Sequence, residues 1–142
     1  MKFSSGCLTT HRVKWLLAVI LWMYFHGCRN EESFSVVVIF PDEAAKEQAS
    51  VLSVFVILEE EGIECGALMD GTAGGYRVER WVEIQLPAPE EIPSLSSVGS
   101  GPRLFYAYAE DSNQVLVLRG CTRAEAGADG ETQIKIALQW VN

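Results

Sequence analysis

The sequence predicts an all-β domain, a single antiparallel β-sandwich, after an N-terminal helical segment. Three observations point to this class. From residue 34 onward, runs of β-branched and aromatic residues are separated by short turn-forming segments. Several runs alternate apolar with polar residues, which is the pattern of a strand with one buried face. No helical pattern in this part of the chain exceeds two turns.

The first predicted elements are two apolar strands and a short helix. Residues 34–40 (FSVVVIF) are β-branched and almost all apolar, as in a strand buried on both faces, and Pro41 ends the run. Residues 42–49 (DEAAKEQA) combine helix formers with acidic residues at the start, so one or two helical turns are expected. Residues 51–58 (VLSVFVIL) form the second strand.

A glycine-containing loop, 64–75, precedes the third predicted strand at 76–86 (YRVERWVEIQL). Alternation in that strand is clean, so one face is buried and the other is polar. One face holds Tyr76, Val78, Arg80, Val82, Ile84 and Leu86, and the other holds Arg77, Glu79, Trp81, Glu83 and Gln85. Residues 87–102 contain four prolines and many serines, which predicts a long surface connection.

The remaining predicted strands lie at 104–109 (LFYAYA), 115–119 (VLVLR) and 131–141 (ETQIKIALQWV). Asp111-Ser112-Asn113 supplies turn residues between the first two, which predicts a hairpin. Six strands without long helices favour one sandwich domain at 34–142, with an immunoglobulin-like or transthyretin-like topology.

Residues 1–27 have the composition of a removable leader. Lys2, Arg12 and Lys14 make its start positive, and an unbroken apolar run of 11 residues follows at 15–25. The apolar part of a signal peptide is roughly 7–15 residues long, whereas a membrane-spanning helix needs roughly 20. The length therefore favours a signal peptide over a permanent span.

The end of this segment, Phe25-His26-Gly27-Cys28, resembles the type II signal sequence of bacterial lipoproteins. The resemblance implies that residues 1–27 are removed, that Cys28 carries the lipid (palmitate), and that 28–33 form a tether to the membrane. Arg29 implies the outer membrane, with the domain facing the periplasm. Ordinary secretion and an uncleaved anchor are the alternatives. The chain is similar to small lipoproteins predicted in Gram-negative bacteria such as myxobacteria, and this likeness implies no activity.

If Cys28 carries lipid, Cys65 and Cys121 remain as a pair in an oxidising compartment, where a disulfide is expected. Because they follow the second and fifth predicted strands, the bond would pin loops at one end of the sandwich. On the chain-entropy model it stabilises the fold by roughly 4 kcal/mol. Two buried free thiols are the alternative, and neither cysteine has the CxxC partner of a redox or metal site.

The composition after Gly27 excludes several functions. All 19 acidic residues follow Gly27 and three of the 11 basic residues precede it, so the remaining formal net charge is −11. Such a surface repels phosphate backbones, which argues against a nucleic-acid partner. Both histidines, His11 and His26, lie in the leader. Ser-His-Asp and Cys-His catalysis and imidazole zinc sites are therefore excluded from the domain.

The acidic run at 59–64 is the remaining candidate for chemistry. Consecutive carboxylates point in alternating directions, which suits neither the pair of a glycosidase nor a calcium loop, and the EF-hand pattern is absent. The run is interpreted as a solvated strand end. We therefore predict no catalytic residue, no metal and no cofactor, and a protein that is not an enzyme.

Aromatic residues are the candidate ligand contacts. Trp81 lies on the polar face of its predicted strand, and Tyr106 and Tyr108 share one face of theirs. An exposed tryptophan stacks on a sugar or anchors a protein partner. The simpler expectation is that a second sheet, a loop or the short helix covers Trp81, and that both tyrosines are core residues. The sequence thus favours a non-catalytic structural or protein-interaction module, with a module that binds carbohydrate or another ligand as the alternative.

Overall fold

The computed structural model describes residues 34–60, 63–87, 92, 95, 98–126 and 132–141. The predictions for the leader at 1–27, for lipid on Cys28 and for the tether at 28–33 lie outside these residues. The order of the elements is β1 (Phe34–Ile39), α2 (Glu43–Gln48), β2 (Val51–Leu58), α3 (Cys65–Asp70), β3 (Val78–Gln85), β4 (Gly101–Glu110), β5 (Leu116–Ala126), β6 (Thr132–Ala137) and β7 (Gln139–Trp140). Neither α2 nor α3 is long and apolar enough to cross a membrane.

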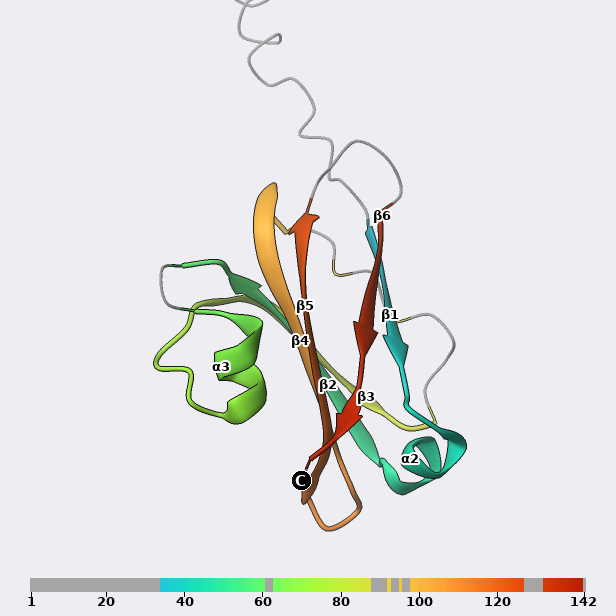
Figure 1. Ribbon diagram of the computed structural model, residues 1–142. Helices are drawn as coiled ribbons and strands as arrows, with labels where there is room; N and C mark the ends of the chain where they lie inside the picture. Colours follow the sequence, from blue (N-terminus) through green and yellow to red (C-terminus); the bar gives the residue numbers. More distant parts are fainter. Residues whose placement is uncertain are drawn as a thin grey trace, which may run out of the picture. The chain divides into compact units, whose positions relative to one another are not determined.

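The strands form two sheets (Figure 1). Five make an antiparallel sheet in the order β3-β2-β4-β5-β7, and β1 pairs with β6 in a second sheet. The prediction of a mostly β, antiparallel chain is confirmed for the larger sheet. It is wrong for β1 and β6, which are parallel. Parallel neighbours need a crossover of a dozen or more residues, and here the strands of the larger sheet supply it.

The main core lies between the two sheets. β1 and β6 direct apolar side chains toward β2, β4 and β5. These side chains are Phe34, Val36, Ile134 and Ile136. The rings of Phe34 and Phe105 meet edge to face, with centroids 5.5 Å apart. The prediction that the strand at 34–40 is buried on both faces is wrong, because Ser35 and Ile39 are exposed on the outer side of β1.

Several elements lie where the sequence predicts them. α2 falls within 42–49, and the Asp42 carboxylate accepts a hydrogen bond from the Ala45 N–H at 2.7 Å, capping the helix. β2 spans the predicted 51–58. The predicted hairpin is confirmed by the antiparallel pair β4–β5, although both strands are longer than predicted.

The last predicted strand, 131–141, is divided between the two sheets. β6 ends at Ala137, and β7 begins at Gln139 and pairs with β5. Between them Leu138 is buried, and its N–H donates to the carbonyl oxygen of Ile39 at 2.8 Å. The sequence conceals this break because Leu138 continues the apolar–polar alternation.

The passage from β6 to β7 brings backbone against Gly120 of β5. A Cβ added at Gly120 would overlap the carbonyl oxygen of Ala137 and lie 2.9 Å from its carbonyl carbon. Backbone yields less readily than the end of a side chain, so we expect Gly120→Ala to lower the free energy of unfolding by about 1–3 kcal/mol. Urea unfolding of the full-length protein measures this. Gly74→Ala is the control, since a Cβ there meets open space; equal losses in both variants would contradict the close approach.

The segment 64–75, predicted as a loop, contains helix α3. The helix ends at Gly71, whose φ of 70° is in the left-handed region that glycine adopts readily. Leu68 of α3 is buried in a second apolar cluster with Ile57 and Leu104. α3 thus covers part of the face of the five-stranded sheet opposite β1 and β6 (Figure 1).

Candidate ligand-binding face

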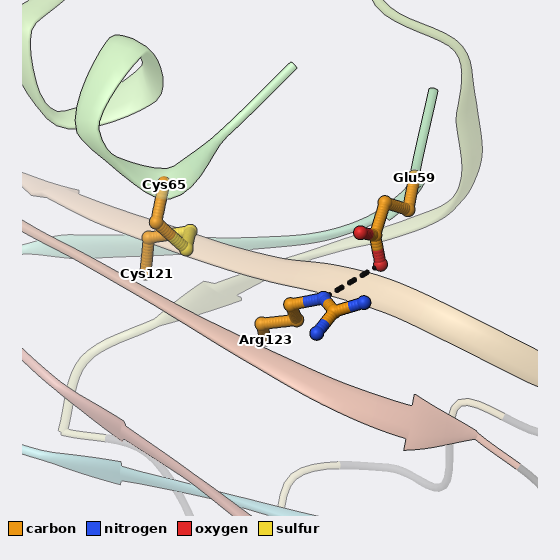
Figure 2. Close-up of a disulfide and its surroundings, with 4 residues drawn as sticks. All are labelled: Glu59, Cys65, Cys121 and Arg123. Atoms are coloured by element: carbon orange, nitrogen blue, oxygen red, sulfur yellow. Dashed lines mark hydrogen bonds and ion pairs between the residues drawn. A yellow bond between two sulfur atoms is a disulfide. The ribbon is translucent and has the colours of Figure 1, made fainter. Parts of the chain in front are cut away.

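A disulfide fastens α3 to the five-stranded sheet (Figure 2). Cys65, the first residue of α3, is bonded to Cys121 of β5, and their Cα atoms are 5.4 Å apart. The structure contains the predicted pair. The prediction that Cys121 follows the fifth strand is wrong, because β5 continues to Ala126. The bond therefore joins a helix to the middle of a strand and does not pin loops at one end.

An ion pair lies beside the disulfide (Figure 2). The Arg123 Nε donates to a carboxylate oxygen of Glu59 at 2.8 Å. This hydrogen bond, with the negative charge of Glu59, raises the pKa of Arg123. Glu60 is 3.9 Å from Arg77. Two carboxylates of the acidic run thus face arginines in largely exposed pairs, which contribute little to stability.

Four aromatic side chains gather on the α3 side of the sheet, and we call them the aromatic cluster: Trp81, Phe55, Tyr106 and Tyr108. Trp81 and Tyr106 are the cross-strand partners of Phe55 in β3 and β4, and Tyr108, two residues along β4, shares their face. The ring centroids of Phe55 lie 6.3 Å from those of Trp81 and 5.5 Å from those of Tyr108, with interplanar angles of 15° and 22°. The cluster is therefore one continuous set of packed rings.

The aromatic cluster is covered at one end and open at the other. Tyr106 is 8% exposed and packs with Leu68 of α3, whereas Trp81 is 60% exposed. The expectation that another element covers Trp81 is wrong, because α3 packs over β4 and β5. The expectation that Tyr106 is a core residue is confirmed, and Tyr108 is half-buried.

The environment of Tyr106 shows which groups surround the covered end. Burial is the main cause that raises the pKa of Tyr106; the charge of Arg119 opposes it, and the nearby Tyr76 and Tyr108 raise it further. The Tyr106 hydroxyl therefore stays protonated at neutral pH. Tyr76 is 39% exposed and lies near enough to Tyr106 to affect its pKa.

Arg119 lies at the β5 side of this face. It is the cross-strand partner of Tyr108 and is half-buried. Its Nη1 would be 3.9 Å from a Cβ on Gly71, so the side chain reaches toward the end of α3. Within the described part of the chain, Arg119 forms no ion pair, unlike Arg77, Arg103 and Arg123.

The strand alternation places Glu79 on the face of Trp81, but the structure places it elsewhere. A bulge in β3 shifts the register between the partners of Val56 and Ile57. Glu79 therefore meets Arg103, which lies on the side of the main core, two residues before Phe105. Arg103 Nε donates to Glu79 at 2.6 Å, and the Gly99 N–H donates to its other oxygen at 2.8 Å.

Burial alone would raise the pKa of Glu79. The hydrogen bonds from Arg103 and Gly99 and the charges of Arg103 and Arg80 outweigh burial, so the pKa lies below its usual value. Glu79 thus pairs with Arg103 at the edge of the main core, and its negative charge does not lie beside Trp81.

No match to this chain is found among protein-family models, curated proteins or solved structures. The chemistry of the face therefore rests on its own residues. Within the described residues, no three His, Cys, Asp or Glu side chains are grouped closely enough to hold a metal ion. What the face offers is stacking on rings, hydrogen bonds from tyrosine hydroxyls and the Arg119 guanidinium, which forms no ion pair with the part of the chain that the structure describes.

The structure brings the three predicted ligand contacts, Trp81, Tyr106 and Tyr108, into one cluster. Sequence reasoning missed Phe55, which joins them, because β2 is apolar throughout and gives no sign of which face is open. It also missed Arg119, because Arg119 stood at the end of a predicted strand that continues for seven more residues. The predicted hairpin could have indicated Arg119, because it lies opposite Tyr108 there.

Proposed function

We propose that this chain is a non-catalytic binding module of the bacterial envelope and that it contacts its partner through the aromatic cluster. The observation that carries the proposal is the 60% exposure of Trp81 against a ring of Phe55 held parallel to it. Large aromatic side chains are concentrated at binding hot spots, and contiguous exposed apolar surface marks interaction sites. The five-stranded sheet supports the aromatic cluster, and α3, which the disulfide bonds to β5, packs next to it.

The proposal includes a lipid anchor on Cys28 and a place at the outer membrane facing the periplasm. Its support is the leader at 1–27 and its ending at Cys28. Within the tether at 28–33, the five residues after Cys28 reach at most about 18 Å. The partner would therefore lie close to the membrane surface.

We also propose that the two sheets form a sandwich of immunoglobulin-like or transthyretin-like type. The support is that β1 and β6 pack their apolar side chains on one face of the five-stranded sheet. This arrangement leaves the opposite face for α3 and for the aromatic cluster.

Photo-crosslinking in intact cells tests the contact surface. A photoreactive phenylalanine at position 81 is expected to form adducts with envelope material. The same residue at position 115 is the control, because Val115 is similarly exposed at 55% but lies in the β4–β5 hairpin. Adducts confined to position 81 would support the proposal; equal yields at both positions, or none at 81, would contradict it.

Replacing Cys28 by serine tests the anchor. We expect the variant to lose incorporation of labelled palmitate and to keep residues 1–27, because in the proposed pathway Cys28 carries the lipid and the leader is removed before it. Cys7→Ser is the control and is expected to label normally, since Cys7 lies within the leader. Labelling that persists in Cys28→Ser would refute the anchor and leave the contact surface to be judged by crosslinking.

A further inference from the structure

We infer that the aromatic cluster and Arg119 together bind a carboxylate-bearing oligosaccharide, with a sugar ring over Trp81 and the acidic group at Arg119. This inference rests on the proposed function, since it names the ligand of the same face. It joins two features that the fold places together: an exposed aromatic end and a guanidinium that, among the described residues, has no carboxylate partner.

The dimensions of the face require a ligand longer than one ring. Trp81 lies on β3 and Arg119 on β5, with β2 and β4 between them. Three strand spacings of about 4.8 Å separate their backbones by about 14 Å. A ligand that touches both residues therefore crosses the strands as an extended chain.

The charges along the face set the direction of the ligand. On the β3 side, Glu83 is paired across the sheet with Ser53 and is exposed, so a carboxylate there would be repelled. On the β5 side, Arg119 is half-buried beside Tyr108 and provides a fork of donors that fits a carboxylate. The neutral part of the ligand thus belongs over Trp81 and the acidic part at Arg119.

Arg119 acts locally against an unfavourable overall charge. The chain after Gly27 carries a formal charge of −11, which repels anions at a distance. This repulsion is screened beyond about 8 Å at physiological salt, whereas a direct guanidinium contact is screened far less. A half-buried arginine that pairs with no carboxylate of the described residues, in so acidic a chain, is the feature that favours an anionic ligand group.

A sugar fits this surface better than a peptide does. A peptide lying across the strands would lose water from its N–H and C=O groups. The aromatic rings offer few hydrogen-bond partners to replace that water. A sugar ring packs its C–H face on an aromatic ring while its hydroxyls remain at the edge, in contact with water or with tyrosine hydroxyls. The face therefore matches a glycan.

Titration of the full-length protein with galacturonic acid oligosaccharides, followed by calorimetry, tests the inference. Their methyl esters have the same rings without the charge and serve as the second probe. We expect the acidic form to bind about tenfold more tightly than the ester, the effect of one charge-assisted contact. Equal affinities for the two forms would overturn the role assigned to Arg119.

Two variants separate the contributions. Trp81→Ala is expected to weaken both probes by about tenfold or more, and Arg119→Gln is expected to weaken only the acidic probe, to the level of the ester. Arg77→Gln is the matched control, because Arg77 is exposed and pairs with Glu60. A loss in Arg77→Gln equal to that in Arg119→Gln would show general charge attraction and would overturn the inference.

Absence of binding to either probe, with crosslinking at position 81 retained, would overturn the glycan ligand and leave the proposed function intact. A concentration-dependent dimer that Trp81→Ala abolishes would assign the face to a second copy of the chain and would also overturn the inference. Loss of both glycan binding and crosslinking at position 81 would refute the two proposals together.

Discussion

Replacing Cys65 and Cys121 together by alanine is expected to lower the free energy of unfolding by about 4 kcal/mol. The disulfide closes a loop between residues 56 positions apart, so its loss returns conformational freedom to the unfolded chain. The two Cα atoms are 5.4 Å apart, within the usual range for the bond, so alanines fit the same backbone. Denaturant unfolding of the full-length variant measures the change.

The effect is expected to begin at α3. A helix of six residues is unstable by itself, and Leu68 is the only buried residue of α3. Without the bond, we expect faster hydrogen exchange in α3 and at Tyr106 beneath it than in β2. The control is reductant: it should destabilise the native protein and leave the double variant unchanged. If the unfolding midpoint of the native protein were the same with and without reductant, the structural role of the disulfide would be contradicted.

Replacing Glu79 by alanine is expected to lower the free energy of unfolding by about 3 kcal/mol, the lower end of the range for breaking a buried ion pair, because this pair is partly buried. The Arg103 side chain is 10% exposed, so the variant would leave its charge nearly buried without a carboxylate. Glu83→Ala is the control, because Glu83 is exposed on the same strand. Comparable losses in the two variants would show that the Arg103 contact contributes little.

The same ion pair gives stability a defined dependence on pH. The pKa of Glu79 is lower in the folded protein than in the unfolded chain, so its contribution is fully present above the ordinary glutamate value of about 4.3. It is lost as pH falls below that value through the lower folded pKa. We expect the native protein to lose more stability than Glu79→Gln between neutral pH and pH of about 3. Parallel pH profiles would contradict the lowered pKa.

The sequence predicted most strands because each is a run of residues with a clear β pattern. It missed α3 because its apolar residues, Ala67, Leu68 and Met69, are too few to show a helical period. It missed the parallel pairing of β1 and β6 because pairing between strands distant in the sequence depends on tertiary contacts. The bulge that moves Glu79 to the core side leaves no trace in the alternation of β3.

The sequence predicted the aromatic residues of the candidate site but not their exposure, which again depends on tertiary contacts. Trp81, Tyr106 and Tyr108 are conspicuous as aromatic residues on strands, but their exposure depends on which parts of the sheet α3 covers. The exposed end of the cluster follows from the disulfide, which holds α3 over β5. Residue patterns therefore indicated the rings, and only the packing of α3 showed which of them meets solvent.

Hydroxyl-radical footprinting in isolated outer membranes, where we propose that the chain is anchored, tests most directly whether Trp81 is a contact residue. Trp140 serves as an internal control, because it is the same residue type and is 39% exposed on β7. Compared with the protein purified in detergent, we predict several-fold less oxidation of Trp81 in the membranes and unchanged oxidation of Trp140. Equal oxidation of Trp81 in both preparations would contradict the account.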